Sequence, residues 1–187
     1  MKNTSKSNCF LLSIVVALCI ASNGKAQEIV KQRTGETLKD FALRIIPART
    51  ELAHEVVQGV FATFTKNMVI LYSTPKAQSS AFSGWVLMPA TNGTYQKFTL
   101  PIEADLSGRF EITAQAVFFA NADKDAQQEL FIIYSTYRNG SGEKEGNAVH
   151  VFDWNGKEFV SHTEVENKLS GLPTAKAVRR KLKILGY

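Results

Sequence analysis

A run of oxygen-bearing side chains is the segment of this sequence best suited to chemistry. Asn121, Asp123, Asp125 and Glu129 occupy positions one, three, five and nine of one polar stretch. A hard cation such as Ca²⁺ needs several oxygens at about 2.3–2.6 Å, and alternate residues of a tight loop supply them. The alternative is an acidic, solvated turn in which Asn121 and Asp123 bond to neighbouring backbone amides. Both interpretations place the stretch in a loop between strands.

The stretch Trp154-Asn155-Gly156-Lys157 predicts a tight hairpin. With a two-residue turn, facing positions have numbers that sum to 311, so that Phe152 faces Phe159. The same register sets Asp153 against Glu158, and two like charges directly opposite each other are unfavourable.

The histidines are poorly placed for a metal or for catalysis. In the expected hairpin His150 and His162 lie on opposite faces, and His54 precedes a different strand. A zinc site needs at least three convergent nitrogen, oxygen or sulfur ligands. We therefore interpret all three as isolated histidines with local partners.

Carboxylates at predicted strand ends are the remaining candidates for acid–base catalysis. They are Glu103, Asp105, Asp153 and Glu158, and the sequence places no two of them together. The chain contains no G-x-S-x-G, phosphate-binding P-loop or H-E-x-x-H motif. A hydrolase is thus the weaker alternative to a binding protein.

Residues 1–26 have the pattern of a secretory signal peptide. Lys2 and Lys6 precede an apolar run over residues 10–21, and small residues occupy positions 24 and 26. The run is too short and wrongly flanked for a membrane span. Cleavage would leave Gln27 as the first residue, in a periplasmic or extracellular protein.

Removal of residues 1–26 changes the chemistry available to the chain. Both cysteines, Cys9 and Cys19, are lost, so neither a disulfide nor a thiol nucleophile remains. Leu18 before Cys19 does not fit a lipoprotein cleavage site. Three of the 22 Lys and Arg residues are lost and none of the 17 acids, which leaves a net charge of +2. This small charge argues against a nucleic-acid-binding surface.

Periodicity predicts a chain of strands between two helices. Residues 27–33 are polar and are expected to form no regular element. Thr34 is a candidate cap for a helix that ends at Pro47. Strands are expected at residues 55–65, 67–74, 82–88, 95–100, 110–120, 129–137, 147–153 and 158–163.

The strand-rich region contains a possible internal repeat. Residues 70–74 and 132–136 match at a spacing of 62, and Asn92-Gly93 corresponds to Asn155-Gly156. The two units cover about residues 55–100 and 110–163, each a four-stranded antiparallel meander. The runs 69–72 and 130–134 lack polar alternation, so these strands are expected to be covered on both faces.

A C-terminal helix is expected over about residues 174–185. Thr174 is its candidate cap, and Val178, Leu182 and Leu185 share one face. We interpret its cations as stabilised by the negative end of the helix dipole, with an anion-binding tail as the alternative. These cations are Lys176, Arg179, Arg180, Lys181 and Lys183.

The stretch F-A-N-A-D-K-D-A-Q-Q-E-L-F-I-I-Y, followed by V-F-D-W-N-G-K-E-F, resembles the FG-GAP or VCBS repeats of exported and integrin-like propeller proteins. Those repeats are four-stranded, blade-like units with a calcium loop. The resemblance implies Ca²⁺ at Asn121, Asp123, Asp125 and Glu129, with the backbone carbonyl of Gln127 as a further ligand. Two units cannot close a propeller, so we expect two sheets that pack on each other or on the helices.

Together these patterns predict one mainly β domain over residues 27–187, with two related four-stranded antiparallel units and flanking N- and C-terminal helices. We expect an exported, monomeric, non-catalytic binding or interaction module of the cell envelope, with a protein or glycan partner. It would neither bind nucleic acid nor span the membrane. An envelope hydrolase, and an inhibitor or accessory subunit of another envelope protein, are the alternatives.

Overall fold

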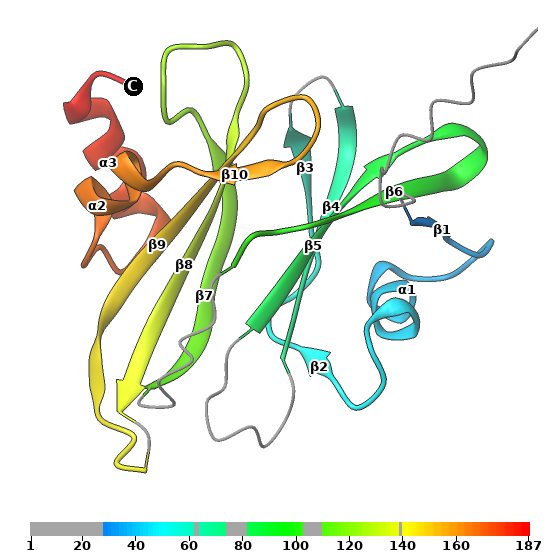
Figure 1. Cartoon of the computed structure of the whole chain (residues 1–187), viewed down its shortest axis with the longest axis horizontal. Coiled ribbons are helices and arrows are strands. Elements are labelled where there is room, and N and C mark those ends of the chain that lie inside the picture. The colour runs from blue at the N-terminus through cyan, green and yellow to red at the C-terminus, as the bar shows by residue number, and fades with distance from the viewer. Residues whose placement is uncertain (1–27, 62–63, 74–81, 103–109, 139) are drawn as a thin grey trace, which may run out of the picture.

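The computed structural model describes residues 28–61, 64–73, 82–102, 110–138 and 140–187. The expected signal peptide, residues 1–26, lies outside this part. The described chain is mainly β, as predicted, with two antiparallel sheets and helices at both ends. Figure 1 shows the elements in four layers: α1, the first sheet, the second sheet, and the pair α2 and α3.

The first sheet has six strands, and the prediction of four was therefore incomplete. Its order is β1-β6-β5-β4-β2, with β3 also paired to β4. The additional strands are the three-residue β1, in a segment expected to be irregular, and the two-residue β2; both are too short to show a period. The strands are β1 Ile29–Lys31, β2 Glu51–Leu52, β3 Val57–Phe61, β4 Phe64–Ser73, β5 Phe82–Pro89 and β6 Thr94–Thr99.

The second sheet is a four-stranded meander in the order β10-β9-β8-β7. Its strands agree with the prediction within three residues at each end. They are β7 Phe110–Ala120, β8 Glu129–Arg138, β9 Lys144–Trp154 and β10 Phe159–Ser161.

Three α-helices of the described chain flank the sheets. The helix α1, Leu38–Ile45, begins three residues later than predicted because Thr37 caps it, accepting a bond from the Asp40 amide at 3.1 Å. The helix α2, Thr163–Leu169, was not predicted. The helix α3, Ala175–Leu185, has the predicted Thr174 cap and ends at Gly186, whose φ of 87° closes it. A short 3₁₀ turn, η1, covers Thr91–Gly93.

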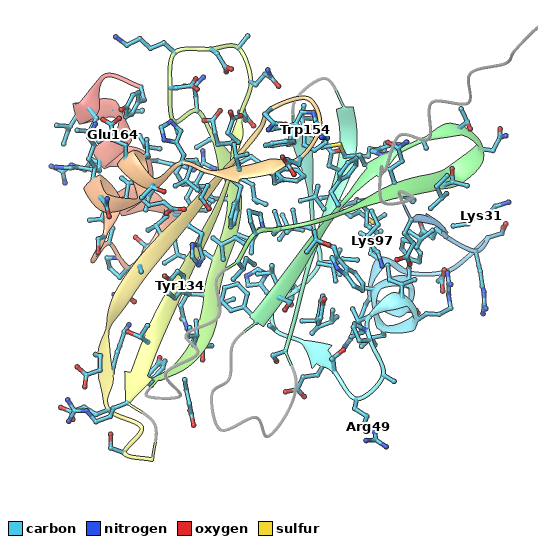
Figure 2. All side chains as sticks on the ribbon, in the orientation of Figure 1. Lys31, Arg49, Lys97, Tyr134, Trp154 and Glu164 are labelled. Carbon is cyan, nitrogen blue, oxygen red and sulfur yellow. The ribbon has the colours of Figure 1, made fainter. Side chains whose placement is uncertain are left out.

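The two sheets pack face to face over one shared apolar core. Val69 and Leu71 of β4, with Leu130 and Ile132 of β8, point into it. Trp154 reaches across the gap, with its ring centroid 4.7 Å from that of Phe98 on β6 (Figure 2). Such contacts hold the sheets together by burial of apolar area and by aromatic pairing.

The outer face of each sheet is covered by helix. On the first sheet, Met68 and Ile70 of β4 belong to one buried cluster with Phe41 of α1. On the second, Phe131 and Ile133 belong to the cluster that includes the apolar faces of α2 and α3. The unbroken apolar runs of β4 and β8 are thus explained as predicted, because both faces of each strand are buried.

The hairpin between β9 and β10 differs from the predicted register. Phe159 pairs with Trp154, and Val160 pairs with Asp153, so the facing numbers sum to 313. The cause is Asn155, whose Oδ1 accepts bonds from two later amides of a four-residue loop, at 3.0 and 2.9 Å. The shift of two residues removes the Asp153–Glu158 clash and leaves every side chain on its predicted face.

The two meanders share one strand order, since β3-β4-β5-β6 corresponds to β7-β8-β9-β10. The matching residues 70–73 and 132–135 lie on the second strand of each. The turns differ, however: Asn92 and Gly93 both have positive φ, whereas in the later turn only Gly156 does. A common origin of the two units stays a prediction.

The free edge of β9 is covered by the segment around α2 rather than by a long strand. The Val151 amide donates to Oε1 of Glu166 at 2.8 Å, and its carbonyl accepts from the His162 amide at 2.8 Å. The Asn147 carbonyl accepts from the Gly171 amide at 3.0 Å. These contacts satisfy edge groups that β10 is too short to reach.

Candidate metal site between β7 and β8

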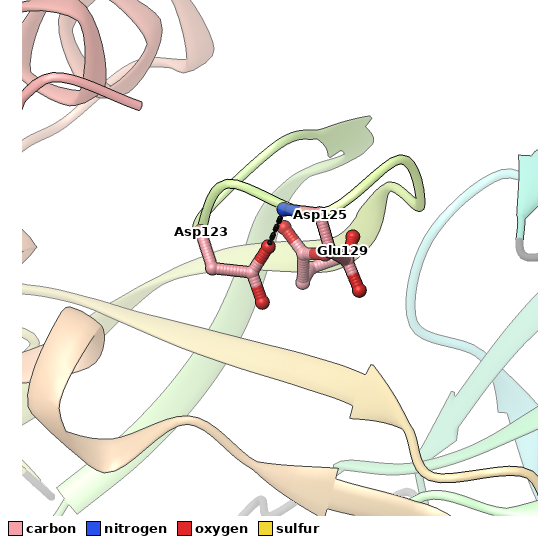
Figure 3. Close-up of side chains that lie close together, drawn as sticks. All are labelled: Asp123, Asp125 and Glu129. Atoms are coloured by element: carbon pink, nitrogen blue, oxygen red, sulfur yellow. Dashed lines mark hydrogen bonds between the residues drawn. The ribbon is translucent and has the colours of Figure 1, made fainter.

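The loop between β7 and β8 brings three carboxylates together. Asp123, Asp125 and Glu129 each present an oxygen, and these oxygens lie within 4.8 Å of one another (Figure 3). Among the described residues it is the one group of three or more metal-ligating acids, histidines or cysteines. Three of the five predicted site residues therefore come together.

Side-chain to backbone bonds hold the loop in this shape. The Asp125 amide donates to Oδ1 of Asp123 at 2.7 Å, and the Gln127 amide donates to Oδ1 of Asp125 at 2.6 Å. Asn121 Nδ2 donates to the carbonyls of Asp125 and Gln127, at 2.7 and 3.3 Å. Each aspartate thus uses its Oδ1 to accept a backbone amide bond, whereas its Oδ2 makes no hydrogen bond within the described part of the chain.

Glu129 occupies a different environment, because its side chain is completely buried. Its Oε2 accepts a bond from the Ala122 amide, whereas Oε1 is buried without a hydrogen-bond partner. Asn121 Oδ1 is also buried and unpartnered. Buried polar atoms in proteins are nearly always satisfied, and two such oxygens beside two aspartates form an environment that suits a positively charged partner.

The electrostatics of the loop agree with this interpretation. The pKa of Glu129 is raised to about 7, chiefly by burial and to a smaller extent by the negative charges of Asp123, Asp125 and Asp153, against the opposing effect of the Ala122 amide. Without a cation, the carboxyl is thus half-protonated near neutral pH. A bound cation would favour the charged form instead.

The donor set fits a hard cation such as Ca²⁺. It consists of carboxylate, amide and carbonyl oxygens, with no sulfur or imidazole. Ala126 stands where calcium loops of this kind commonly carry glycine. No residue from 121 to 129 has a positive φ, so the backbone accommodates alanine there without strain.

A pKa near 7 also suits a general acid, but Glu129 is fully buried and cannot touch a substrate.

The structure brings no two of the four acids proposed for the hydrolase alternative together within the described residues. Glu103 and Asp105 lie outside the described residues. Asp153 is half-buried and accepts from the Trp154 amide at 2.6 Å, and Glu158 is exposed in the hairpin loop.

Sequence reasoning missed the surroundings of His150. Its ring stacks on Tyr134 and Phe152, with centroid distances of 4.7 and 5.6 Å, and its Nδ1 lies 3.7 Å from Oε1 of Glu166. Glu166 belongs to the unpredicted α2, so no sequence pattern linked the two. His162 lies just beyond the end of β10, where its amide donates to the Val151 carbonyl, and no group of three metal-ligating side chains in the described part of the chain includes a histidine.

Comparison with protein-family models, curated proteins and solved structures finds no match to this chain. Within the described ranges, no helix has both the length and the apolar character needed to cross a bilayer.

Proposed function

We propose that the protein is an exported, non-catalytic interaction module whose second sheet is stabilised by a calcium ion. One observation carries the calcium assignment: a completely buried glutamate, Glu129, has an unpartnered oxygen beside Asp123 and Asp125. An ordinary acidic turn needs no buried carboxylate, since its acids cap backbone amides from the surface.

The residues that would hold the ion are Asn121, Asp123, Asp125 and Glu129 through side-chain oxygens, and Gln127 through its carbonyl. The ion supplies positive charge that offsets the repulsion and burial of the carboxylates. The chain contributes the positioning: Asn121 Nδ2 ties the two sides of the loop together, and the Ala122 amide orients the Glu129 carboxylate. The resemblance to FG-GAP and VCBS repeats supports the same ligands.

The interaction role rests on the signal-like segment, the loops that connect the strands and the absence of a converging catalytic set within the described residues. A protein or glycan of the cell envelope is the partner class that we propose. Connecting loops on a rigid β scaffold are where recognition surfaces are commonly built.

Thermal unfolding in millimolar Ca²⁺ and in chelator tests the calcium site. A ligand at a hundredfold excess over its Kd stabilises the native state by ~2.7 kcal/mol, which raises Tm by roughly 5–10 °C in a chain of this size. The variant Asp123→Ala with Asp125→Ala should lose this rise. The matched control, Glu51→Ala with Glu111→Ala, removes two exposed acids elsewhere and should keep it. An unchanged wild-type Tm in Ca²⁺ would exclude the site.

Intact-mass analysis of the exported protein tests the expected processing. The charged start, the apolar run and the small residues at positions 24 and 26 predict a chain that begins at Gln27. A mass that retains Met1, or that includes a lipid on Cys19, would contradict export through a cleaved signal peptide.

A further inference from the structure

The outward face of α3 consists of four cations. Lys176, Arg179, Arg180 and Lys183 follow the i, i+3, i+4, i+7 spacing of one helical face, and all four are exposed. The helix carries no acidic residue. No ion pair joins any of the four to another described residue. We call this face the cationic stripe.

The helix dipole does not explain the stripe, and our interpretation from sequence was wrong on this point. Only Lys183 lies in the last turn, whereas Lys176 lies in the first turn, at the positive end. The other two helices follow the dipole: α1 has Asp40 in its first turn and Arg44 in its last, and α2 has acids first and Lys168 last. Moreover, Lys176 with Arg180 and Arg179 with Lys183 are like-charge i, i+4 pairs, which destabilise a helix.

The fold nevertheless holds the stripe firmly. Val178 and Leu182, on the inner face of α3, are buried against the second sheet. The guanidinium of Arg179 lies 4.9 Å from the ring centroid of Phe118, so one cation of the stripe is anchored on an aromatic ring of that sheet. The backbone that carries the four unneutralised cations is thus held in place, and such an array is complementary to an extended anionic surface.

An apolar depression lies beside the stripe. Its volume is about 430 Å³, and Leu172, Ala177 and Ile184 line it together with stripe residues and Lys181. Ile184 is 70% exposed, the most exposed large hydrophobic side chain of the described chain. Apolar side chains next to cations match a partner that has anionic head groups above an apolar layer.

We propose that α3 docks the protein on the surface of an anionic lipid bilayer, lying flat with the stripe among the head groups and Ile184 toward the acyl boundary. The size of the surface favours a membrane over a folded protein partner. The helix is about 16 Å long, and a stable protein interface needs about 20–30 residues on each side. A lipid surface requires no shape complementarity. The exposed apolar side chain favours lipid over nucleic acid.

Flotation of the processed protein with vesicles tests the proposal. We expect binding to phosphatidylcholine vesicles that contain about 30% phosphatidylglycerol, none to pure phosphatidylcholine, and loss of binding at high salt. The stripe variant, with Lys176, Arg179, Arg180 and Lys183 all changed to Gln, should bind at least about a hundredfold more weakly. Circular dichroism checks that it folds.

A matched control removes the same charge from elsewhere on the surface. Arg33, Lys39, Arg49 and Lys144 are exposed, and their combined change to Gln should leave vesicle binding nearly intact. Equal loss in both variants would overturn the proposal in favour of a general charge effect. So would no binding of the wild type to anionic vesicles.

The variant Ile184→Ser separates lipid from other anions. It should weaken vesicle binding several-fold and leave binding to polyglutamate and to duplex DNA unchanged. If Ile184→Ser has no effect on vesicles, and a soluble polyanion binds as tightly as the vesicles, the stripe recognises an acidic macromolecule and the lipid proposal fails.

Discussion

At the scale of residues, one glutamate links the polar loop to the interior of the second sheet. Glu129 pairs with Ala120 at the start of β8 and is fully buried there, while Asp123 is half-buried and Asp125 exposed. The same carboxylate receives the Ala122 amide, so the loop closes around it. The protonation state of Glu129 therefore affects both the shape of the loop and the stability of the sheet.

We expect Glu129→Gln to remove a pH dependence of stability. The pKa of Glu129 is raised from 4.5 to about 7 in the folded chain. A group whose pKa is higher in the folded chain contributes stability that is fully present below its pKa in the unfolded chain. This stability is lost as the pH rises through the pKa in the folded chain. Between pH 4.5 and about 7, the wild type in chelator should thus lose about 3 kcal/mol relative to Glu129→Gln.

Denaturant unfolding of both proteins from pH 4 to pH 8 measures this difference. Added Ca²⁺ competes with the proton and should flatten the wild-type curve, while the variant should not respond. Parallel pH profiles in chelator would show that Glu129 does not titrate as described.

Much of this site could be predicted from residue types and spacing, because alternate oxygen side chains already indicate a cation loop. The burial of Glu129 could not be predicted. The sequence places it at the polar end of a loop, and only pairing with β7 and the packing of the two sheets enclose it. The unpartnered Oε1, which carries the calcium proposal, is thus a tertiary feature.

At the scale of elements, one close approach between the sheets depends on a residue without a side chain. A Cβ added to Gly59 of β3 would lie 2.1 Å from Cε2 of Phe119 on β7. The aromatic ring of one sheet therefore packs directly against the backbone of the other.

We expect Gly59→Ala to destabilise the protein by about 1–3 kcal/mol, because the ring or the strand must move. The matched control is Gly146→Ala in β9, where a Cβ meets no atom within 4 Å and φ is not positive. That change should be neutral or slightly stabilising, by up to ~1 kcal/mol, through the unfolded state. Urea midpoints for the two variants test the prediction, and equal midpoints would contradict the close packing.

The long elements could be predicted because their signals are local. The unbroken runs of β4 and β8, and the cap and apolar face of α3, depend on neighbours in sequence. The short elements could not. The strand β1 forms only because residues 94–96 lie beside it and pair with it. The pairing of β10 with β9 is displaced by two residues from the expected register and ends at Ser161, and α2 begins shortly after that residue.

At the scale of the whole molecule, the two sheets share one core and should unfold together. The chain has two tryptophans, one in each sheet. Trp85 of β5 contacts Tyr72 at a centroid distance of 4.7 Å, and Trp154 of β9 contacts Phe98 across the sheets. Trp85 is therefore a probe of the first sheet, and Trp154 is a probe of the second sheet and of its contact with the first.

We expect one cooperative transition, because separation of the sheets would expose the apolar core between them. In Trp85→Phe, the fluorescence of Trp154 should follow the same urea transition as far-UV circular dichroism, and in Trp154→Phe the fluorescence of Trp85 should do likewise. Non-coincident curves in either variant would mean that the sheets are independent units.

The closed edge of β9 has a consequence for behaviour at high concentration. A strand with free amides and carbonyls is a template on which another chain can add a strand, and such addition leads to fibrils. Here Glu166, His162 and Gly171 bind edge groups of Val151 and Asn147, which β10 leaves uncovered. The short α2 segment therefore protects this edge against aggregation, and a chain truncated before it would expose both the edge of β9 and the apolar outer face of the second sheet.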